Sequence, residues 1–84
     1  MKTKHSLQNI MGEIGHALAE LRLQKGYDSI KDFTNDHDLP MIQYWRIEKG
    51  KANLTLKSLH RLLTIHGLSI GDFFCYLNSN RSMQ

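Results

Sequence analysis

The spacing of apolar side chains constrains the fold of this 84-residue chain more than any other feature. Apolar residues recur three or four positions apart in nearly every segment, which is the period of one face of an α-helix. The alternation that a half-buried strand needs never continues beyond a few residues. The chain also has a single proline, so few positions interrupt a helix. The sequence therefore predicts an all-α fold.

The first two helices are predicted from an apolar stripe and from residues that begin or end a helix. The stripe of the first helix consists of Leu7, Ile10, Met11, Ile14, Leu18 and Leu21. Gly26 is expected to end this helix, because glycine adopts the left-handed conformation of a helix C-terminus without strain. Ser29 can cap the second helix, with Asp32 three residues later as in a capping box.

Three further helices are predicted on the same grounds. Pro40 fits the first turn of the third helix, where a missing N–H costs little. Thr55 can cap the fourth helix, and Gly67 is expected to end it. Ser69 and Asp72 can form a capping box at the start of the fifth. The apolar positions of the last two helices are Leu56, Leu59, Leu62, Leu63, Ile70, Phe73, Phe74 and Leu77.

A very short turn separates the second helix from the third. The second is predicted from Ser29 to Asp36, and the third follows Pro40 and ends in Ile47-Glu48-Lys49-Gly50. Helices joined by so short a turn must cross at a steep angle. In a helix-turn-helix, this arrangement presents the second helix of the pair to the major groove of DNA.

Charged residues are distributed unevenly along the chain. The formal net charge of +3 is too small to indicate a nucleic-acid partner by itself. Four basic residues and no acidic residue lie between Glu48 and Asp72, namely Lys49, Lys51, Lys57 and Arg61. Such segregation indicates one positively charged face, as a phosphate backbone requires. The alternative is chance clustering on a solvated surface.

Composition and motifs exclude several other classes of protein. The single cysteine, Cys75, cannot form an internal disulfide, which favours a cytoplasmic protein, and its apolar neighbours favour burial over a redox role. No apolar run is long enough to cross a membrane. No histidine or cysteine spacing suits a metal. No phosphate-binding loop, nucleophile elbow or carboxylate pair indicates an enzyme or a cofactor.

From about Ile14 to Phe74 the chain resembles the Cro/repressor-like (XRE-type) helix-turn-helix family. The resemblance is carried, in order, by Ile14-Gly15, Leu18, Arg22, Gly26, Phe33, Ile47-Glu48-Lys49-Gly50, Thr55-Leu56, Leu59, Gly67-Leu68-Ser69-Ile70 and Phe73-Phe74. It implies a five-helix lambda-repressor-like DNA-binding domain over residues 14–77. Residues 1–13 would form an N-terminal arm and the start of the first helix, and the polar residues 78–84 a disordered tail.

The resemblance implies an inward-facing ion pair between Arg22 and Glu48. Such a pair would hold the third helix against the scaffold, because removing one partner leaves a poorly solvated charge. The alternative is two unrelated surface charges.

The resemblance also assigns the residues that contact DNA. The first half of the third helix would face base edges, and the end of that helix would contact phosphates. The residues implied are Ser29, Met41, Ile42, Gln43, Trp45, Arg46, Lys49 and Lys51. Arg46 suits guanine and Gln43 suits adenine, whereas Lys49 and Lys51 would hold phosphates without reading sequence.

Three interpretations of Met41, Ile42 and Trp45 stay open on the sequence. These side chains could pack against thymine methyl groups or anchor a protein interface. Alternatively, one of them, Trp45 first of all, could fold back onto the first helix as part of the core. The first interpretation predicts a DNA-binding transcriptional regulator, expected to be a repressor. The second predicts a protein-binding module, such as an antitoxin that binds a toxin.

The aromatic and apolar residues of the fifth helix carry more apolar surface than one short helix can bury inward. Phe73, Phe74, Tyr76 and Leu77 lie within five consecutive positions. They could form a symmetric dimer contact, as two-fold readers of DNA need for paired half-sites, or close the end of the core. A homodimer through the C-terminal helix is therefore one of the partners to be tested.

Overall fold

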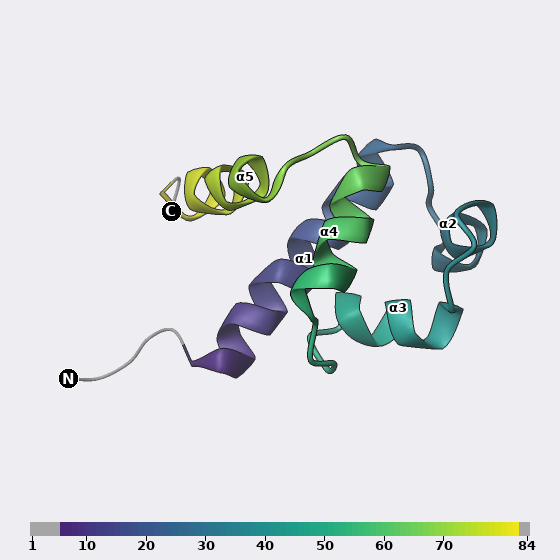
Figure 1. Cartoon of the computed structure of the whole chain (residues 1–84), viewed down its shortest axis with the longest axis horizontal. Coiled ribbons are helices and arrows are strands. Elements are labelled where there is room, and N and C mark those ends of the chain that lie inside the picture. The colour runs from purple at the N-terminus through teal and green to yellow at the C-terminus, as the bar shows by residue number, and fades with distance from the viewer. Residues whose placement is uncertain (1–5, 83–84) are drawn as a thin grey trace. The chain divides into compact units, whose positions relative to one another are not determined.

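The computed structural model describes residues 6–82 of the chain. These residues form five α-helices and no β-strand, so the predicted all-α class is confirmed (Figure 1). The helices are α1 (Leu7–Gln24), α2 (Ile30–Asp36), α3 (Met41–Glu48), α4 (Leu56–Ile65) and α5 (Ile70–Ser82). None of the helices in the described residues has the length and apolar character that crossing a membrane requires.

The chain divides into two compact units, Met1–Asn53 and Leu54–Gln84. The first contains α1, α2 and α3, and the second contains α4 and α5. The domain predicted over residues 14–77 spans both units, and its boundaries stay a prediction. Of the predicted N-terminal arm, residues 1–5 lie outside the described residues, and α1 begins at Leu7.

The C-terminal helix is longer than its apolar pattern indicates. The prediction of a disordered tail from residue 78 is wrong for residues 78–82, which continue α5 to Ser82. This stretch contains neither glycine nor proline, and each added residue extends the backbone hydrogen bonds of an existing helix. Residues 83–84 lie outside the described residues.

Side-chain caps begin the helices where the sequence predicts them. Ser29 Oγ accepts a hydrogen bond of 2.9 Å from the N–H of Asp32, and Thr55 caps α4 in the same way. The capping box of α5 is complete. The N–H of Asp72 donates to Ser69 Oγ at 2.9 Å, and the N–H of Ser69 donates to Asp72 Oδ2 at 3.2 Å. These local bonds satisfy N–H groups that have no partner inside the helix.

The first four helices all end in the same backbone motif. One residue adopts a positive φ, and the N–H of the next residue donates to the carbonyl five positions earlier. The residues with positive φ are Gly26 (102°), Asp38 (56°), Gly50 (71°) and Gly67 (70°). The backbone bonds run from Tyr27 to Arg22, Leu39 to Thr34, Lys51 to Arg46 and Leu68 to Leu63, at 2.8–3.1 Å. The predicted helix ends at Gly26 and Gly67 are confirmed.

In the first unit, α3 packs against both α1 and α2. Its C-terminal end approaches α1 very closely at Gly15. A Cβ atom at this position would overlap the carbonyl oxygen of Ile47 and would lie 2.5 Å from that of Glu48. Gly50 approaches Gly12 in the same region, one turn earlier on α1. The missing side chain of Gly15 therefore makes room for the end of α3, and that of Gly50 lets the following residues pass close to the backbone of α1.

Phe33 is the centre of the aromatic packing in this unit. Its side chain is fully buried, and its ring centroid lies 4.7 Å from His37, 5.2 Å from Tyr44 and 5.3 Å from Tyr27. These residues belong to α2, its C-terminal cap, α3 and the loop after α1. The aromatic cluster therefore joins α2 to α3 and to the loop after α1.

In the second unit, α4 packs against α5. Among the side chains described in this unit, the buried apolar ones are Leu59, Leu62, Leu63 and Phe73. Leu56, predicted to belong to the stripe, is exposed because it is the first residue of α4, one turn before Leu59. Cys75 is also exposed, so the prediction that it is buried is wrong.

Candidate nucleic-acid interface

The turn between α2 and α3 is built by backbone bonds at the end of α2. The N–H of Leu39 donates to the carbonyl of Thr34 at 2.8 Å, and Asp38 takes the left-handed conformation between them. Pro40 then has extended geometry and precedes the first residue of α3, so it is the N-cap and not part of the first turn. The left-handed Asp38 thus ends α2, and Pro40 starts α3 in a new direction.

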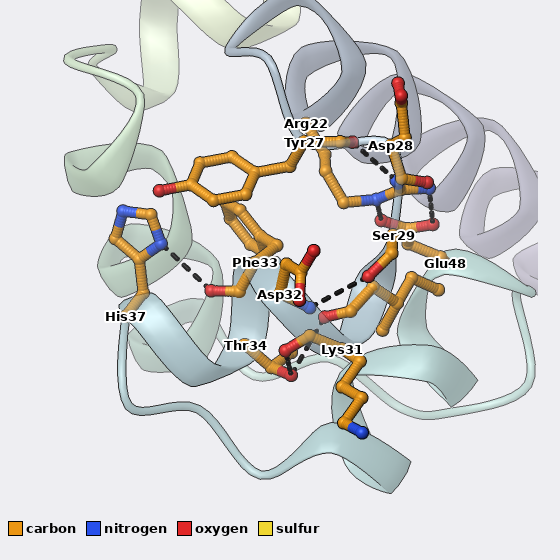
Figure 2. A network of polar contacts seen from close by, with 11 residues as sticks. Arg22, Tyr27, Asp28, Ser29, Lys31, Asp32, Phe33, Thr34, His37 and Glu48 are labelled. Atoms are coloured by element: carbon orange, nitrogen blue, oxygen red, sulfur yellow. Dashed lines mark hydrogen bonds and ion pairs between the residues drawn. The ribbon is translucent and has the colours of Figure 1, made fainter.

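Side-chain bonds along α2 reinforce this turn. His37 Nδ1 lies 3.0 Å from the carbonyl oxygen of Phe33. A carbonyl oxygen only accepts, so Nδ1 carries the proton and donates (Figure 2). The buried Thr34 hydroxyl lies 2.9 Å from the carbonyl of Ile30, to which it donates. The short helix thus gains support from its own side chains.

Arg22 and Glu48, the residues expected to form an inward-facing ion pair, lie in direct contact. Arg22 Nε donates to Glu48 Oε2 at 2.8 Å, and Nη2 donates to Oε1 at 3.1 Å. Both residues are buried. Two parallel bonds between a guanidinium and a carboxylate are stronger and more directional than one. The alternative of two unrelated surface charges is excluded by this geometry.

The same guanidinium also holds the segment that leads into α2. Figure 2 shows Arg22 between the Glu48 carboxylate and the backbone of Tyr27 and Asp28. Its Nη1 donates to the carbonyls of these two residues, at 2.8 Å and 3.0 Å. One side chain therefore connects α1, the start of α2 and the end of α3. It fixes how α3 leans on the rest of the unit.

The surroundings of this pair perturb two pKa values. The hydrogen bonds with Glu48 raise the pKa of Arg22 above its ordinary value, against the opposing effect of burial. Burial raises the pKa of Tyr44, and the nearby Glu48 carboxylate raises it further. The buried Tyr44 hydroxyl makes no hydrogen bond in the structure. Tyr44 therefore stays neutral in the folded protein at pH values where exposed tyrosines ionise.

The outward face of α3 carries the residues that the resemblance assigned to base contacts. Met41, Ile42 and Trp45 keep 43%, 65% and 41% of their surface exposed, and Gln43 and Arg46 are exposed as well. The interpretation that one of the three apolar residues belongs to the buried core is therefore wrong. The exposed apolar surface stays open to a partner, either DNA or protein.

Two contacts link the outward face of α3 to the residues that follow it. Lys49 Nζ lies 5.8 Å from the ring centroid of Trp45, in a cation–π contact one helical turn along. Arg46 Nη2 donates to the carbonyl of Lys51 at 2.9 Å. Trp45 therefore contacts Lys49, and Arg46 contacts Lys51. Neither contact was expected from the sequence.

A repeated sequence pattern could have revealed the second contact. Arg22-Leu-Gln-Lys-Gly26 and Arg46-Ile-Glu-Lys-Gly50 share arginine, an apolar residue, a polar residue, lysine and glycine. In both segments the glycine has a positive φ, and the arginine donates to the carbonyl of the residue that follows the glycine. The two segments thus form the same structure at the ends of α1 and α3.

Charges near the interface are of both signs. Lys49 and Lys51 are exposed at the end of α3, whereas Asp28 and Asp32 are exposed beside the start of α2. The Ser29 hydroxyl accepts the bond that caps α2, and it retains a proton to donate to another group. The lysines are therefore the better candidates for phosphate contacts than the start of α2.

No cluster of metal-binding side chains exists in the described part of the chain. Comparison with protein-family models, with curated proteins and with solved structures gives no match for this chain. Function must therefore be inferred from the chemistry of the α3 surface and its supports.

Proposed function

We propose that this protein is a sequence-specific DNA-binding transcriptional regulator, a repressor, that places α3 in the major groove. The observation that carries the proposal is the division of α3 into two faces. One face is held by α1 and α2 through Tyr44 and Glu48, and the other exposes Gln43, Arg46 and the apolar residues beside them. A helix held this way presents its outward side chains rigidly to a partner.

The dimensions and chemistry of the major groove suit this face. The groove is about 12 Å wide and admits one helix with its side chains. Its base edges offer hydrogen-bond donors and acceptors together with thymine methyl groups. Gln43 and Ile42 match these two kinds of feature, and Lys49 and Lys51 lie at the helix end, where phosphates would flank it.

The direct test is selection from a random duplex library at roughly 0.15 M salt, with sequencing of the retained DNA. An enriched sequence supports the proposal, and an enriched palindrome would also indicate two copies on one site. Retention of DNA without enrichment, or no retention, would contradict sequence-specific binding.

Lys51→Ala tests the phosphate contact, with Lys25→Ala as the matched control at the end of α1. The Lys51 variant should weaken binding to all sequences alike and reduce the salt slope of log K by about one unit. The Lys25 variant should leave the slope nearly unchanged. Equal slopes for the wild type and the Lys51 variant would show that this loop does not touch phosphate.

A protein-binding module, such as an antitoxin, is the second candidate function. The observation in its favour is the apolar surface of Met41, Ile42 and Trp45, because exposed aromatic and methionine side chains are common in protein interfaces. Trp45→Ala separates the two functions. Loss of a protein partner with unchanged DNA binding supports the second, whereas loss of DNA binding supports the first.

A homodimer through α5 is a further proposal about the same protein. Phe74 and Cys75 are exposed on this helix. A sedimentation mass of one chain at high micromolar concentration would contradict a dimer in the absence of DNA.

A further inference from the structure

The guanidinium of Arg46 already has a partner within the protein. Its Nη2 donates to the carbonyl of Lys51, while the backbone carbonyl of Arg46 accepts from the N–H of Lys51 at 2.8 Å. Both polar backbone groups of Lys51 are therefore held by one residue. This arrangement fixes the direction in which the chain leaves α3, and with it the position of the Lys51 side chain.

The same arrangement at the end of α1 shows that it can be purely structural. There, Arg22 accepts from the N–H of Tyr27 at 3.1 Å and donates to its carbonyl at 2.8 Å. Arg22 is buried and cannot reach a ligand. The five-residue pattern shared by the two segments thus specifies a clamp on the following residue in both places.

Few other side chains on the outward face of α3 suit guanine. Lys49 follows the last residue of α3, at the opposite end of the helix from Met41, and its ammonium group lies over the ring of Trp45. The exposed residues of the first turn are Met41, Ile42 and Gln43. Apolar side chains contact the thymine methyl group, and a glutamine amide pairs with N6 and N7 of adenine.

We propose that Arg46 is a positioning residue that holds Lys51 against phosphate and reads no base, so that Ile42 and Gln43 read A·T pairs. This inference rests on the proposed function and reassigns the guanine contact that the sequence suggested for Arg46. Residues at the start of α3 then read base identity, and residues at the end of α3 hold the phosphate backbone of the DNA.

The first experiment measures base preference with the full chain. Wild type, Arg46→Met and Gln43→Ala are each used for selection from the random duplex library. Arg46→Met keeps the aliphatic stem and removes the donors. We expect the wild type to select an A·T-rich site. Arg46→Met should keep the same base preference at reduced affinity. Gln43→Ala should lose the preference for adenine at one position of the site. Loss of a G·C preference in Arg46→Met would overturn the inference.

The second experiment tests whether Arg46 acts through Lys51. Affinity for the selected site is measured for Arg46→Met, Lys51→Ala and the double variant. If Arg46 positions Lys51, the double variant binds only slightly less well than Lys51→Ala. If the double variant instead loses the product of the two single-variant fold-losses in affinity, the two residues act independently and the inference is overturned. Arg46→Lys, which restores a charged group that can donate to the Lys51 carbonyl, should recover part of the affinity.

A third measurement needs no DNA and separates failure of this inference from failure of the proposed function. Amide hydrogen exchange of residues 50–53 is compared between the free wild type and Arg46→Met, with Lys25→Ala as control. We expect exchange roughly tenfold faster in Arg46→Met alone. Unchanged exchange would show that Arg46 does not hold the loop. If exchange accelerates but no DNA is retained, the clamp stands, whereas the proposed function and the A·T reading both fail.

Discussion

Two glycines on α1 should respond in opposite directions to the same substitution. Gly12 and Gly15 lie one turn apart inside the helix, where alanine is favoured over glycine by about 1 kcal/mol. A Cβ atom at Gly12 meets no atom within 4 Å. Gly12→Ala should therefore raise the free energy of unfolding by about 1 kcal/mol, and Tm by about 4–8 °C for a chain of this size.

At Gly15 the added methyl group meets backbone atoms that cannot rotate away. It would overlap the carbonyl oxygen of Ile47 and lie 2.5 Å from the oxygen and 2.8 Å from the carbon of the Glu48 carbonyl. The end of α3 must then move, which also strains the bonds between Glu48 and Arg22. A clash of about 2–4 kcal/mol exceeds the helix gain of about 1 kcal/mol, for a net loss of about 1–3 kcal/mol.

Thermal and urea unfolding followed by circular dichroism measure this difference directly. The two variants should differ by about 2–4 kcal/mol, or roughly 8–32 °C in Tm. The comparison controls for helix propensity, since both substitutions are the same and lie in one helix. Equal stabilisation by both substitutions would refute the close approach of α3 to α1 on which the placement of the outward face of α3 depends.

Two further predictions concern the buried groups beneath α3. Glu48→Gln should lower the free energy of unfolding by about 2–4 kcal/mol, because it leaves the buried Arg22 charge without its partner. Asp36→Asn, which alters an exposed bond with Tyr27, should cost less than about 1 kcal/mol, and equal Tm values for the two variants would count against the pair. Tyr44→Phe should be neutral or stabilising by up to about 1 kcal/mol at pH 7, since the lost hydroxyl has no hydrogen-bond partner. The pKa of Tyr44 is raised in the folded state, so above the ordinary tyrosine pKa of about 10 this residue ionises in the unfolded chain first, and the free energy of unfolding falls as pH rises. Urea unfolding at pH 7 and above pH 10 should therefore show a smaller alkaline loss for Tyr44→Phe, and an identical loss in both proteins would contradict this.

The two arginine clamps suggest how a small chain obtains a rigid surface. Arg22 and Arg46 each fix the residue after a helix end, and Arg22 also bonds Glu48. Both clamps hold the carbonyl group of a residue beyond the helix end, where the regular bonds of the helix no longer fix the backbone. Both arginines therefore act at the C-terminal end of α3, Arg22 through Glu48 and Arg46 through Lys51.

Local signals were enough for the helices and most of their ends. Ser29, Thr55 and Ser69 cap helices as predicted, and Gly26 and Gly67 end them, because caps and left-handed turns involve only a few neighbouring residues. The resemblance singled out the residues that lie on the outward face of α3, whereas the alternative that placed Trp45 in the core is wrong.

Local signals were also present where the prediction failed. The polar residues 78–82 extend α5, because the absence of glycine and proline outweighs the lack of an apolar stripe. The clamp of Arg46 on Lys51 follows a five-residue pattern that also occurs at Arg22. The pattern predicts a clamp only after the structure of one of the two segments is known.

Tertiary packing decided what no local pattern contains. Gly12 and Gly15 look alike in the sequence, but only Gly15 lies against the carbonyls of α3. Cys75 lies among apolar residues and is nevertheless exposed, because one face of α5 is buried at Phe73 and neighbouring positions on a helix point elsewhere. The sequence by itself determined where the helices begin, where most of them end and which side chains each can present. Which of those side chains are buried depends on contacts between residues far apart in the chain, and only the folded structure supplies these.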